Sequence, residues 1–158
     1  MRRADRAVTD RAQIEDFLRR QTVLRVAFWD EGEIYIVPVN YGYCREGERD
    51  VFYFHGACAG RKYALSLHTP RVGFELDGSY QLQQGREACS WSATYQSVVG
   101  TGRVSLVTEP EAKRKGLAQI MRQATGREDW AFPEESVNRT AVFRLEAEQL
   151  SCKANREK

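Results

Sequence analysis

Apolar and polar residues alternate with the two-residue period of β-strands over most of the chain. The alternation is regular from Val72 to Asp77, where large apolar residues occupy every second position. β-Branched and aromatic residues dominate the other stretches of this kind. The pattern predicts strands over residues 23–28, 34–43, 51–55 and 72–77, a long hairpin with arms over 88–97 and 98–107, and a last strand over 141–150.

Three stretches show the 3.6-residue period of helices. Asp10 followed by Gln13 is typical of a helix start, and it predicts a helix over 10–20 with Ile14, Phe17 and Leu18 on one face. Arg61 to His68 forms a short helix between Gly60 and Pro70. A third helix runs to Gly126, with Thr108 and Glu111 as its capping box and an apolar stripe formed by Leu117, Ile120, Met121 and Ala124.

The order of these elements indicates the fold class. Six or seven strands interrupted by only two or three helices lack the regular β-α-β alternation of a parallel sheet. We therefore expect a mainly β fold, a small antiparallel barrel with peripheral helices. It forms one domain over 1–158, with the N-terminal helix over 10–20, the barrel over 23–107 and 140–150, and a helical insertion over 109–138.

Two features of the predicted strands point to close packing. Gly100 and Gly102 share a face of their strand, where we expect another group to approach the backbone. The strand over 34–43 is apolar on both faces, whereas one core needs only one such face. The two sets are Tyr35, Val37, Val39 and Tyr41 on one face, and Ile34 and Ile36 on the other. The second apolar face predicts a dimer.

Composition counts against several classes of function. The net charge of +2 is too small for a nucleic-acid protein that depends on a strong basic field. The chain has no apolar run near the roughly 20 residues of a membrane helix and no apolar stretch of a secretory signal, so we expect a cytoplasmic protein without a membrane partner. Its four cysteines have no zinc-like spacing and are expected to be free thiols, and we expect no metal site.

The segment from Tyr53 to Lys62 has the ingredients of a phosphate site. Gly56 and Gly60 give the backbone freedom, and Arg61 and Lys62 lie at the predicted helix start. Free amide groups at a helix N-terminus, a bidentate guanidinium and a compact ammonium all favour an anion. On spacing alone, the alternative that both cations are merely solvated surface residues stays open.

Several sequence blocks resemble the pyridoxamine 5′-phosphate oxidase-related flavoproteins, in particular their nitroimidazole-resistance-type branch. The blocks are Tyr53-Phe54-His55-Gly56 followed by Gly60-Arg61-Lys62, Tyr35-Ile36-Val37-Pro38-Val39-Asn40-Tyr41-Gly42, Tyr95-Gln96-Ser97-Val98-Val99-Gly100, Gly126-Arg127-Glu128-Asp129-Trp130 and Val142-Phe143-Arg144-Leu145. The resemblance implies a split β-barrel homodimer that binds flavin mononucleotide (FMN) at the subunit interface.

The resemblance also implies roles for particular residues. Arg61 and Lys62 would bind the FMN phosphate. The backbone around Val37, Pro38, Val39 and Asn40, and around Tyr53, Phe54, His55 and Gly56, would flank the isoalloxazine and the ribityl chain. Tyr95, Gln96 and Ser97, from the same or the partner subunit, would complete the phosphate and ribityl contacts. His55 lies near the flavin in this branch and could deliver a proton, or it could only hydrogen-bond the cofactor or a neighbouring strand.

The function implied is FMN-dependent reduction of a small oxidant such as a nitroimidazole or another nitroaromatic, with an unidentified electron donor. Oxidation of pyridoxamine 5′-phosphate itself is disfavoured because the substrate-phosphate residues of that branch are not found. Two other hypotheses stay open: a flavin- or haem-binding split barrel without turnover, with His55 or His68 as axial ligand, and a small barrel that binds single-stranded nucleic acid. The weak net charge counts against nucleic acid.

Overall fold

Seven strands dominate the computed structural model, which describes residues 3–156. The strands are β1 (Ala7–Val8), β2 (Val23–Asp30), β3 (Glu33–Glu46), β4 (Arg49–Ala57), β5 (Arg71–Gln83), β6 (Ser92–Val107) and β7 (Thr140–Asn155). The α-helices are α1 (Arg11–Arg20), α2 (Arg61–His68), α3 (Pro110–Thr125) and α4 (Glu134–Arg139), and the 3-10 turns are η1 (Ala4–Arg6) and η2 (Ala88–Ser90).

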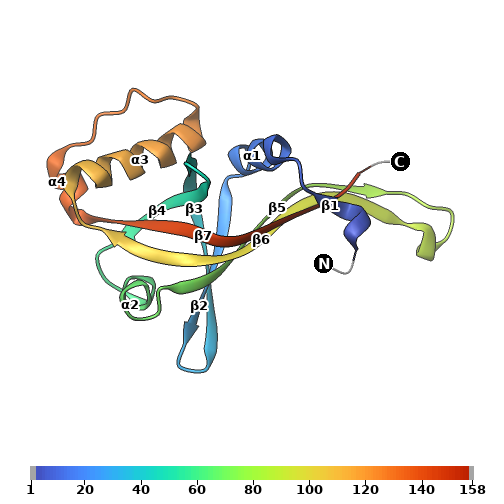
Figure 1. The fold of residues 1–158 in the computed structure, drawn as a ribbon, viewed down its shortest axis with the longest axis horizontal. Helices are drawn as coiled ribbons and strands as arrows, with labels where there is room; N and C mark the ends of the chain where they lie inside the picture. The colour runs from blue at the N-terminus through green and yellow to red at the C-terminus, as the bar shows by residue number, and fades with distance from the viewer. Residues whose placement is uncertain (1–2, 157–158) are drawn as a thin grey trace.

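The strands form an antiparallel sheet that closes on itself. Their order is β1-β7-β4-β3-β2-β5-β6, and a further pairing between β6 and β7 joins the ends into a ring, with β1 attached to β7. The predicted antiparallel barrel of six to seven strands is confirmed. Beyond the barrel, β5 and β6 continue together as a two-stranded arm that extends past β1 (Figure 1).

Alternate residues of the strands fill the barrel with large apolar side chains. Phe52 packs against Phe74, with ring centroids 5.2 Å apart, and Phe54 stacks on Phe143 at 5.0 Å. These four rings are almost completely buried. Aromatic pairs at such separations stabilise a core beyond the area they bury. α1 adds Phe17 and Leu18 to this core, as the apolar stripe predicted.

Local sequence accounts for the tip of the β2–β3 hairpin. Two residues, Glu31 and Gly32, connect the strands, and both have positive φ angles of 48° and 102°. A two-residue loop with positive φ at both positions matches the right-handed twist of the paired strands. Glu31 and Gly32 therefore form the turn between the two strands predicted over 23–28 and 34–43.

The predicted hairpin with arms over 88–97 and 98–107 is wrong. β6 runs through Ser97 and Val98 without a turn, and the chain instead reverses between β5 and β6 in residues 84–91. Ser97 and Val98 are paired with β5 on one side and with β7 on the other. A residue with ladder partners on both sides has no freedom to turn, and this constraint is not visible in a single stretch of sequence.

The expectation of a close approach at Gly100 and Gly102 is confirmed. A Cβ atom on Gly100 would lie 2.3 Å from Cζ of Phe74, and one on Gly102 would lie 2.3 Å from the carbonyl oxygen of Glu146. The absence of side chains here lets Phe74 and β7 pack directly on the β6 backbone.

Several predicted boundaries are also corrected. β4 continues past His55 to Ala57 because its last residues pair with β7. β7 continues past Leu150 to Asn155 across a bulge, since Thr101 faces Gln149 whereas Gly102 faces Ala147. The bulge inserts one residue and reverses the alternation that the sequence pattern followed. The short strand β1 was not predicted.

α3 begins one residue later than its predicted capping box. Its N-cap is Glu109, with Pro110 at the first helical position, and no side chain caps this end, so the Thr108–Glu111 box is wrong. Gly126 ends the helix in the left-handed conformation. Of the predicted stripe only Ile120 is buried. The helix packs on β3 through the neighbouring Gln119 backbone, since a Cβ on Gly42 would lie 2.2 Å from the Gln119 carbonyl carbon.

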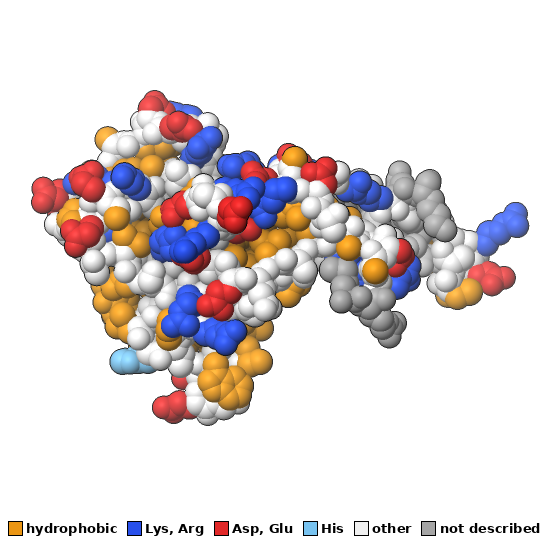
Figure 2. All heavy atoms as spheres, in the orientation of Figure 1, with side chains coloured by type: hydrophobic (Ala, Val, Ile, Leu, Met, Phe, Trp, Pro, Cys, Tyr) orange, Lys and Arg blue, Asp and Glu red, His pale blue; other side chains and the backbone are white. Residues whose placement is uncertain are grey.

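α3 covers only part of the outer face of the barrel. The ends of β3 and β4 lie beneath it, but the first half of β3 remains open to solvent (Figure 1). Exposed fractions there reach 66% for Ile34, 59% for Ile36 and 56% for Trp29 on β2. Figure 2 shows hydrophobic side chains at the surface near the tip of the β2–β3 hairpin. No helix within residues 3–156 has the length and apolar character needed to cross a membrane.

Candidate functional site

The wall of the barrel is split between β3 and β4. The two strands pair only from Tyr41 and Phe54 toward their connecting turn. Before Tyr41, residues 33–40 pair with β2, and after Phe54, residues 55–57 pair with β7. The two strand edges that diverge here are the segments that the sequence assigned to the flavin, and we refer to this break in the pairing of β3 with β4 as the opening.

Lys62 reaches from α2 to the edge of β4 at this opening. Its ammonium donates a hydrogen bond to the carbonyl oxygen of His55 at 3.0 Å and lies 5.6 Å from the ring centroid of Phe54 and 5.4 Å from that of Phe143. Gly56 makes room for it, because a Cβ there would lie 2.7 Å from Nζ of Lys62. Burial against these groups lowers the pKa of Lys62.

Arg61 is held by the tip of the β2–β3 hairpin. Its Nε donates to Oδ2 of Asp30 at 2.6 Å, and its Nη2 lies 3.6 Å from Oε2 of Glu33. The guanidinium also stacks over the ring of Tyr35, 4.6 Å from its centroid. The hydrogen bond to Asp30 raises the pKa of Arg61. About half of its side chain stays exposed, so donors remain for an anion at the opening.

The N-terminus of α2 adds backbone donors to these two cations. Gly60 is the N-cap, with a φ angle of 97° that disfavours other residues, and no side chain caps the helix. The first backbone hydrogen bond of the helix runs from the amide of Ala64 to the carbonyl of Gly60. The preceding amides, in residues 61–63, have no carbonyl partner within the helix. These oriented donors favour a phosphate or carboxylate.

His55 lies on the β4 edge of the opening, one residue past the last β3–β4 pair. The residue is exposed, yet the protein atoms packed around the ring lower its pKa, and the nearby Lys62 ammonium lowers the pKa further. The imidazole is therefore neutral at pH 7. A neutral imidazole has one nitrogen that donates and one that accepts a proton.

The side chains of Tyr53 and Phe54 pack in the core and under α3. Phe54 is buried in the core, and Tyr53 packs beneath Gly116 of α3, where its hydroxyl donates to Glu46 at 3.0 Å. Burial and this hydrogen bond raise the pKa of Tyr53 to about 12. Of these two residues only the backbone is near the opening, as the resemblance implied for this segment.

On the opposite edge the side chains alternate between core and solvent. Val37 packs against the core and Val39 is buried, whereas Pro38 and Asn40 are exposed. The amide of Asn40 donates to the carbonyl of Thr22 at 3.0 Å, which ties this edge to the start of β2. The edge therefore offers backbone groups and two small exposed side chains.

Tyr95, Gln96 and Ser97 lie far from this opening within one chain. They face Asn155, Ala154 and Lys153 of β7, whereas His55 faces Val142 of the same strand. The separation from Val142 to Lys153 along β7 is roughly 36 Å at about 3.3 Å per residue. The structure thus separates, within one chain, two groups of residues that the sequence assigned to one site.

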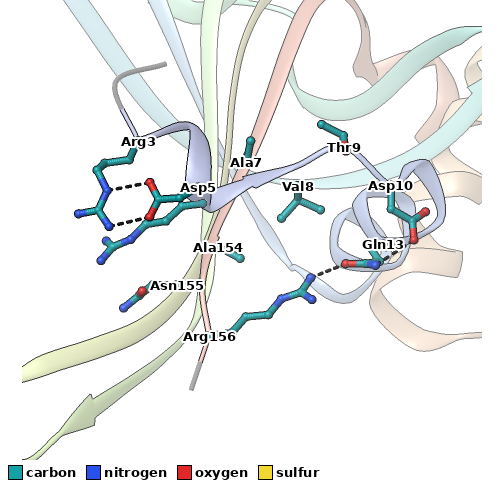
Figure 3. Close-up of a pocket in the computed structure, with 11 residues that line it drawn as sticks. Arg3, Asp5, Ala7, Val8, Thr9, Asp10, Gln13, Ala154, Asn155 and Arg156 are labelled. Carbon is teal, nitrogen blue, oxygen red and sulfur yellow. Dashed lines mark hydrogen bonds and ion pairs between the residues drawn. The ribbon is translucent and has the colours of Figure 1, made fainter. Parts of the chain in front are cut away.

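A hollow that the sequence did not suggest lies at the other end of β7. It measures about 470 Å³ and is bounded by the N-terminal segment, the start of α1 and the end of β7, with lining side chains that include Arg3, Asp5, Arg6, Asp10, Asn155 and Arg156 (Figure 3). Its only sequence signal is the density of arginines in the first eleven residues. Among the described residues, no cluster of histidine, cysteine and acidic side chains could hold a metal, and all four cysteines are free.

Comparisons with known proteins agree with this geometry. The family model of pyridoxamine 5′-phosphate oxidase matches residues 10–154. A solved structure of a candidate 5-nitroimidazole antibiotic resistance protein from Bacteroides thetaiotaomicron superimposes with a TM-score of 0.81 at 26% identity, covering 94% of this chain and 86% of that one. A search of functionally curated proteins finds no match.

Two more distant structures share the fold. The flavocytochrome Anf3 from Azotobacter vinelandii has a TM-score of 0.81 at 22% identity, covering 99% of this chain and 72% of that one. An FAD- and haem-binding protein from Mycobacterium smegmatis has a TM-score of 0.82 at 18% identity, covering 96% and 74%. The barrel described above is therefore one that flavin-binding proteins use.

Proposed function

The chain belongs to the pyridoxamine 5′-phosphate oxidase family, and from this membership we propose that it binds FMN at the opening between β3 and β4 and reduces small oxidants with it. One observation carries the proposal. Arg61, Lys62 and the uncapped start of α2 lie together beside the only stretch where β3 and β4, neighbours in the described sheet, separate.

The residues at the opening fit a phosphate-bearing flavin. Gly56 lets the Lys62 ammonium reach the β4 edge, and the amides of residues 61–63, which have no carbonyl partner within the helix, lie at a helix start. A flat ring needs flanking backbone and a phosphate needs concentrated donors. Both are present within one segment of nine residues, from β4 to the start of α2.

Each residue of the proposed site has a physical role. Arg61 offers a planar fork to phosphate oxygens while Asp30 keeps it oriented, and Lys62 supplies a point charge while it fixes the β4 edge through the His55 carbonyl. Flavin, when bound, supplies the electron-transfer chemistry. His55 is neutral at pH 7, so its imidazole can hold or release a proton at the edge of the opening.

The proposed substrates are nitroimidazoles and other small nitroaromatics. Support comes from the 26% identity to the candidate nitroimidazole-resistance protein over 94% of this chain. A flat nitroaromatic ring would lie against a flat cofactor, and His55 could take up a proton from solvent on its free ring nitrogen and pass that proton to the reduced substrate. The reaction also requires an electron donor, which we propose is a diffusible reductant.

We further propose that the protein works as a homodimer. Trp29, Ile34 and Ile36 expose more than half of their surface on neighbouring strands, on the face that carries the β3 edge of the opening. Contiguous exposed apolar patches of this kind mark interaction surfaces. A second copy on this face would exclude water from the flavin site.

Arg61→Ala combined with Lys62→Ala tests the phosphate assignment. Each charge-assisted contact stabilises a complex by about 1.5 to 3 kcal/mol, so FMN affinity should fall at least tenfold per residue. The matched control is Arg71→Ala, which removes an arginine from an exposed ion pair with Glu148 at 3.7 Å. FMN titrations followed by flavin fluorescence measure both variants, and an unchanged dissociation constant in the double variant would refute the assignment.

The absorbance spectrum of the purified protein separates the flavin proposal from haem binding. Flavin bands support the proposal. His55 is the exposed histidine at the opening, so a Soret band that disappears in His55→Ala would show haem ligation instead. Turnover is measured as the loss of nitroimidazole absorbance under anaerobic conditions with an added reductant. Flavin binding without this loss would show that the protein carries flavin but does not reduce the nitroimidazole.

A further inference from the structure

A small cluster of charges lies within the exposed apolar face of the sheet. The apolar side chains of this face come from β3, β2 and β6 and include Ile36, exposed at 59%, Trp29 at 56% and Val99 at 53%. Arg25 on β2 is paired in register with Glu75 on β5, and Glu75 is paired with Val99. Residues paired in register share a face, and so do alternate residues of a strand. The charged side chains of Arg25 and Glu75 therefore lie among the apolar ones.

Arg25 binds two carboxylates at once. Its Nη1 donates to Oδ1 of Asp77 at 2.6 Å and to Oε2 of Glu75 at 3.1 Å. Glu75 and Asp77 are two residues apart on β5, so their carboxylates are neighbours on the same face. One guanidinium and two carboxylates leave the cluster with a net charge of −1.

The strands beside Glu75 offer no second cation. In the described sheet its partner on β6 is the apolar Val99, and its partner on β2 is Arg25 itself. Arg71, four residues from Glu75 on β5, forms an ion pair with a glutamate of β7 at 3.7 Å. Arg25 is therefore the one cation that forms an ion pair with Glu75 or Asp77 among the residues that the structure describes.

A lysine on the same face is too distant to complete the cluster. Lys153 on β7 and Asp77 on β5 are both paired with Ser97 of β6, so two strand spacings separate them. At about 4.8 Å per spacing the separation is roughly 10 Å. Salt screens exposed charges at this distance, so Lys153 offsets little of the excess negative charge.

Partial burial already disfavours the charged form of Glu75. Burial and then the adjacent Asp77 carboxylate raise the pKa of Glu75, and the hydrogen bond from Arg25 offsets these effects only in part. About a third of the Glu75 side chain, 34%, remains exposed to the water that stabilises its charge. Any protein surface that covers this face removes that water.

Two-fold symmetry brings this cluster into contact with the face of another copy that carries the same cluster. In a two-fold dimer the same surface patch meets itself, so each copy buries the same excess negative charge. A buried charge without full compensation strongly opposes association. Two adjacent carboxylates can remove the excess by sharing one proton, because the protonated carboxyl donates a hydrogen bond to the remaining carboxylate.

We propose that two copies of the chain associate through this face with one proton shared by Glu75 and Asp77 in each copy. The inference rests on the proposed function, which puts a second copy on the face around Trp29, Ile34 and Ile36, and it adds a pH-dependent switch to that contact. Each copy takes one proton from solvent, which forms one O–H bond on a carboxylate. Because association binds protons, the dimer is favoured as the pH falls and dissociates as the pH rises.

The first test measures the dimer as a function of pH. Fluorescence-detected sedimentation of the wild-type protein gives the dissociation constant of the dimer, which should rise at least about tenfold between about pH 5.5 and about pH 7.5. Glu75→Gln mimics the protonated carboxyl. Its dimer should be at least as tight at the higher pH as the wild-type dimer is at the lower pH, with little dependence on pH. Misfolding of the variant could not produce this gain in affinity.

Glu111→Gln is the matched control. Glu111 also forms an ion pair with an arginine, Arg114 at 3.4 Å, but it lies on α3. The pH dependence of the Glu111→Gln dimer should equal that of the wild type. His55 titrates in a similar pH range, so a Glu75→Gln dimer that keeps the full wild-type pH dependence would overturn the role of Glu75 and point to the histidine instead.

The second test counts the protons. Concentrated wild-type protein is diluted at about pH 6.5 in a calorimeter, once in PIPES and once in imidazole, two buffers that differ in ionisation enthalpy. The difference between the two heats should correspond to the release of about two protons per dimer, one from each copy. Glu75→Gln should show a release near zero. Equal heats for the wild type in the two buffers would overturn the proposal.

The remaining outcomes separate the proton switch from the proposed function. Wild-type protein that is a monomer at every pH contradicts both the proposed dimer and the switch. A dimer whose dissociation constant does not change with pH, or falls as the pH rises, overturns the switch alone and would show that a cation of the second copy compensates the cluster. FMN affinity is measured separately at one pH, and failure to bind flavin contradicts the proposed flavin site without affecting the proton count.

Discussion

The absence of a side chain at Gly56 shapes the β4 edge of the site. Gly56 gives the Lys62 ammonium its path to the His55 carbonyl, and the same contact puts a positive charge close to the imidazole. The lysine thus has two effects, because it donates a hydrogen bond to the His55 carbonyl and it adds to the lowering of the His55 pKa that burial of the ring begins.

The lowered pKa of His55 predicts a pH dependence of stability. A histidine whose folded-state pKa is below its unfolded value of about 6.5 favours folding above that value. Its contribution to the unfolding free energy is lost as the pH falls from about 6.5 through the lowered folded-state pKa. His55→Gln should remove this part of the pH dependence, as measured by urea unfolding at several pH values.

Nuclear magnetic resonance titration tests the cause directly. Lys62→Met should raise the pKa of His55 only part of the way to its ordinary value, because desolvation by the surrounding protein atoms is the larger cause and remains. His68, on α2, gives a second imidazole signal as an internal reference in the same sample. An unchanged His55 titration in Lys62→Met would contradict the assigned influence of the ammonium.

At the scale of elements, a buried carboxylate on β4 is one of the contacts that attach α1 to the barrel. Asp50 on β4 is 7% exposed and accepts hydrogen bonds from Nη1 of Arg11 at 2.9 Å and from the Tyr43 hydroxyl at 2.7 Å. Burial and the Asp50 contact raise the pKa of Tyr43, so this hydroxyl stays protonated as a donor. The contact anchors the helix that contributes Phe17 and Leu18 to the core.

Asp50→Asn should therefore destabilise the fold by about 2 to 4 kcal/mol, because a neutral amide removes the buried counter-charge of the Arg11 guanidinium and leaves it only its ion pair with Glu15 at 3.0 Å. Asp16→Asn is the matched control on the same helix, since its ion pair with Arg20 at 2.8 Å is exposed and should contribute less than about 0.5 kcal/mol. Urea unfolding gives both values. Equal losses of unfolding free energy in Asp50→Asn and Asp16→Asn would show that Asp50 holds α1 no more strongly than an exposed ion pair does.

At the scale of the whole molecule, the apolar outer face predicts self-association. Ile36→Lys places a charge at the centre of the patch formed by Trp29, Ile34 and Ile36, and it should convert a dimer to a monomer in sedimentation velocity. FMN affinity should fall in parallel, because the proposed site is completed by the second copy. Leu67→Lys is the control, since Leu67 is 50% exposed but lies on α2. A wild-type monomer that binds FMN tightly would contradict this prediction.

Short-range chemistry in the sequence was sufficient for several features. Asp10 accepts a hydrogen bond from the amide of Ala12 at the predicted start of α1, and α2 spans the predicted residues 61–68. Glycines and Pro70 constrain the backbone where they stand, so these boundaries depend on few neighbours. The resemblance to flavin-binding split barrels could also be read from residue blocks alone.

Pairing between segments that are distant in the sequence determined the features that the sequence did not predict. The continuity of β6 through Ser97, the bulge of β7 and the face that α3 buries depend on partners far away in the chain. Tyr95 and His55 belong to one predicted site, yet Tyr95 faces Asn155 and His55 faces Val142, close to opposite ends of β7.

The sequence by itself thus determined the strand-rich barrel, the glycine-flanked cations and the class of ligand they suit, because each follows from residues close together along the chain. Only the tertiary structure decided where the barrel opens, that Arg61 is held by Asp30, that Lys62 bonds to His55, and that Arg6 donates a hydrogen bond to Tyr95. These features arise from strand register and from contacts between distant segments, and no local pattern encodes either.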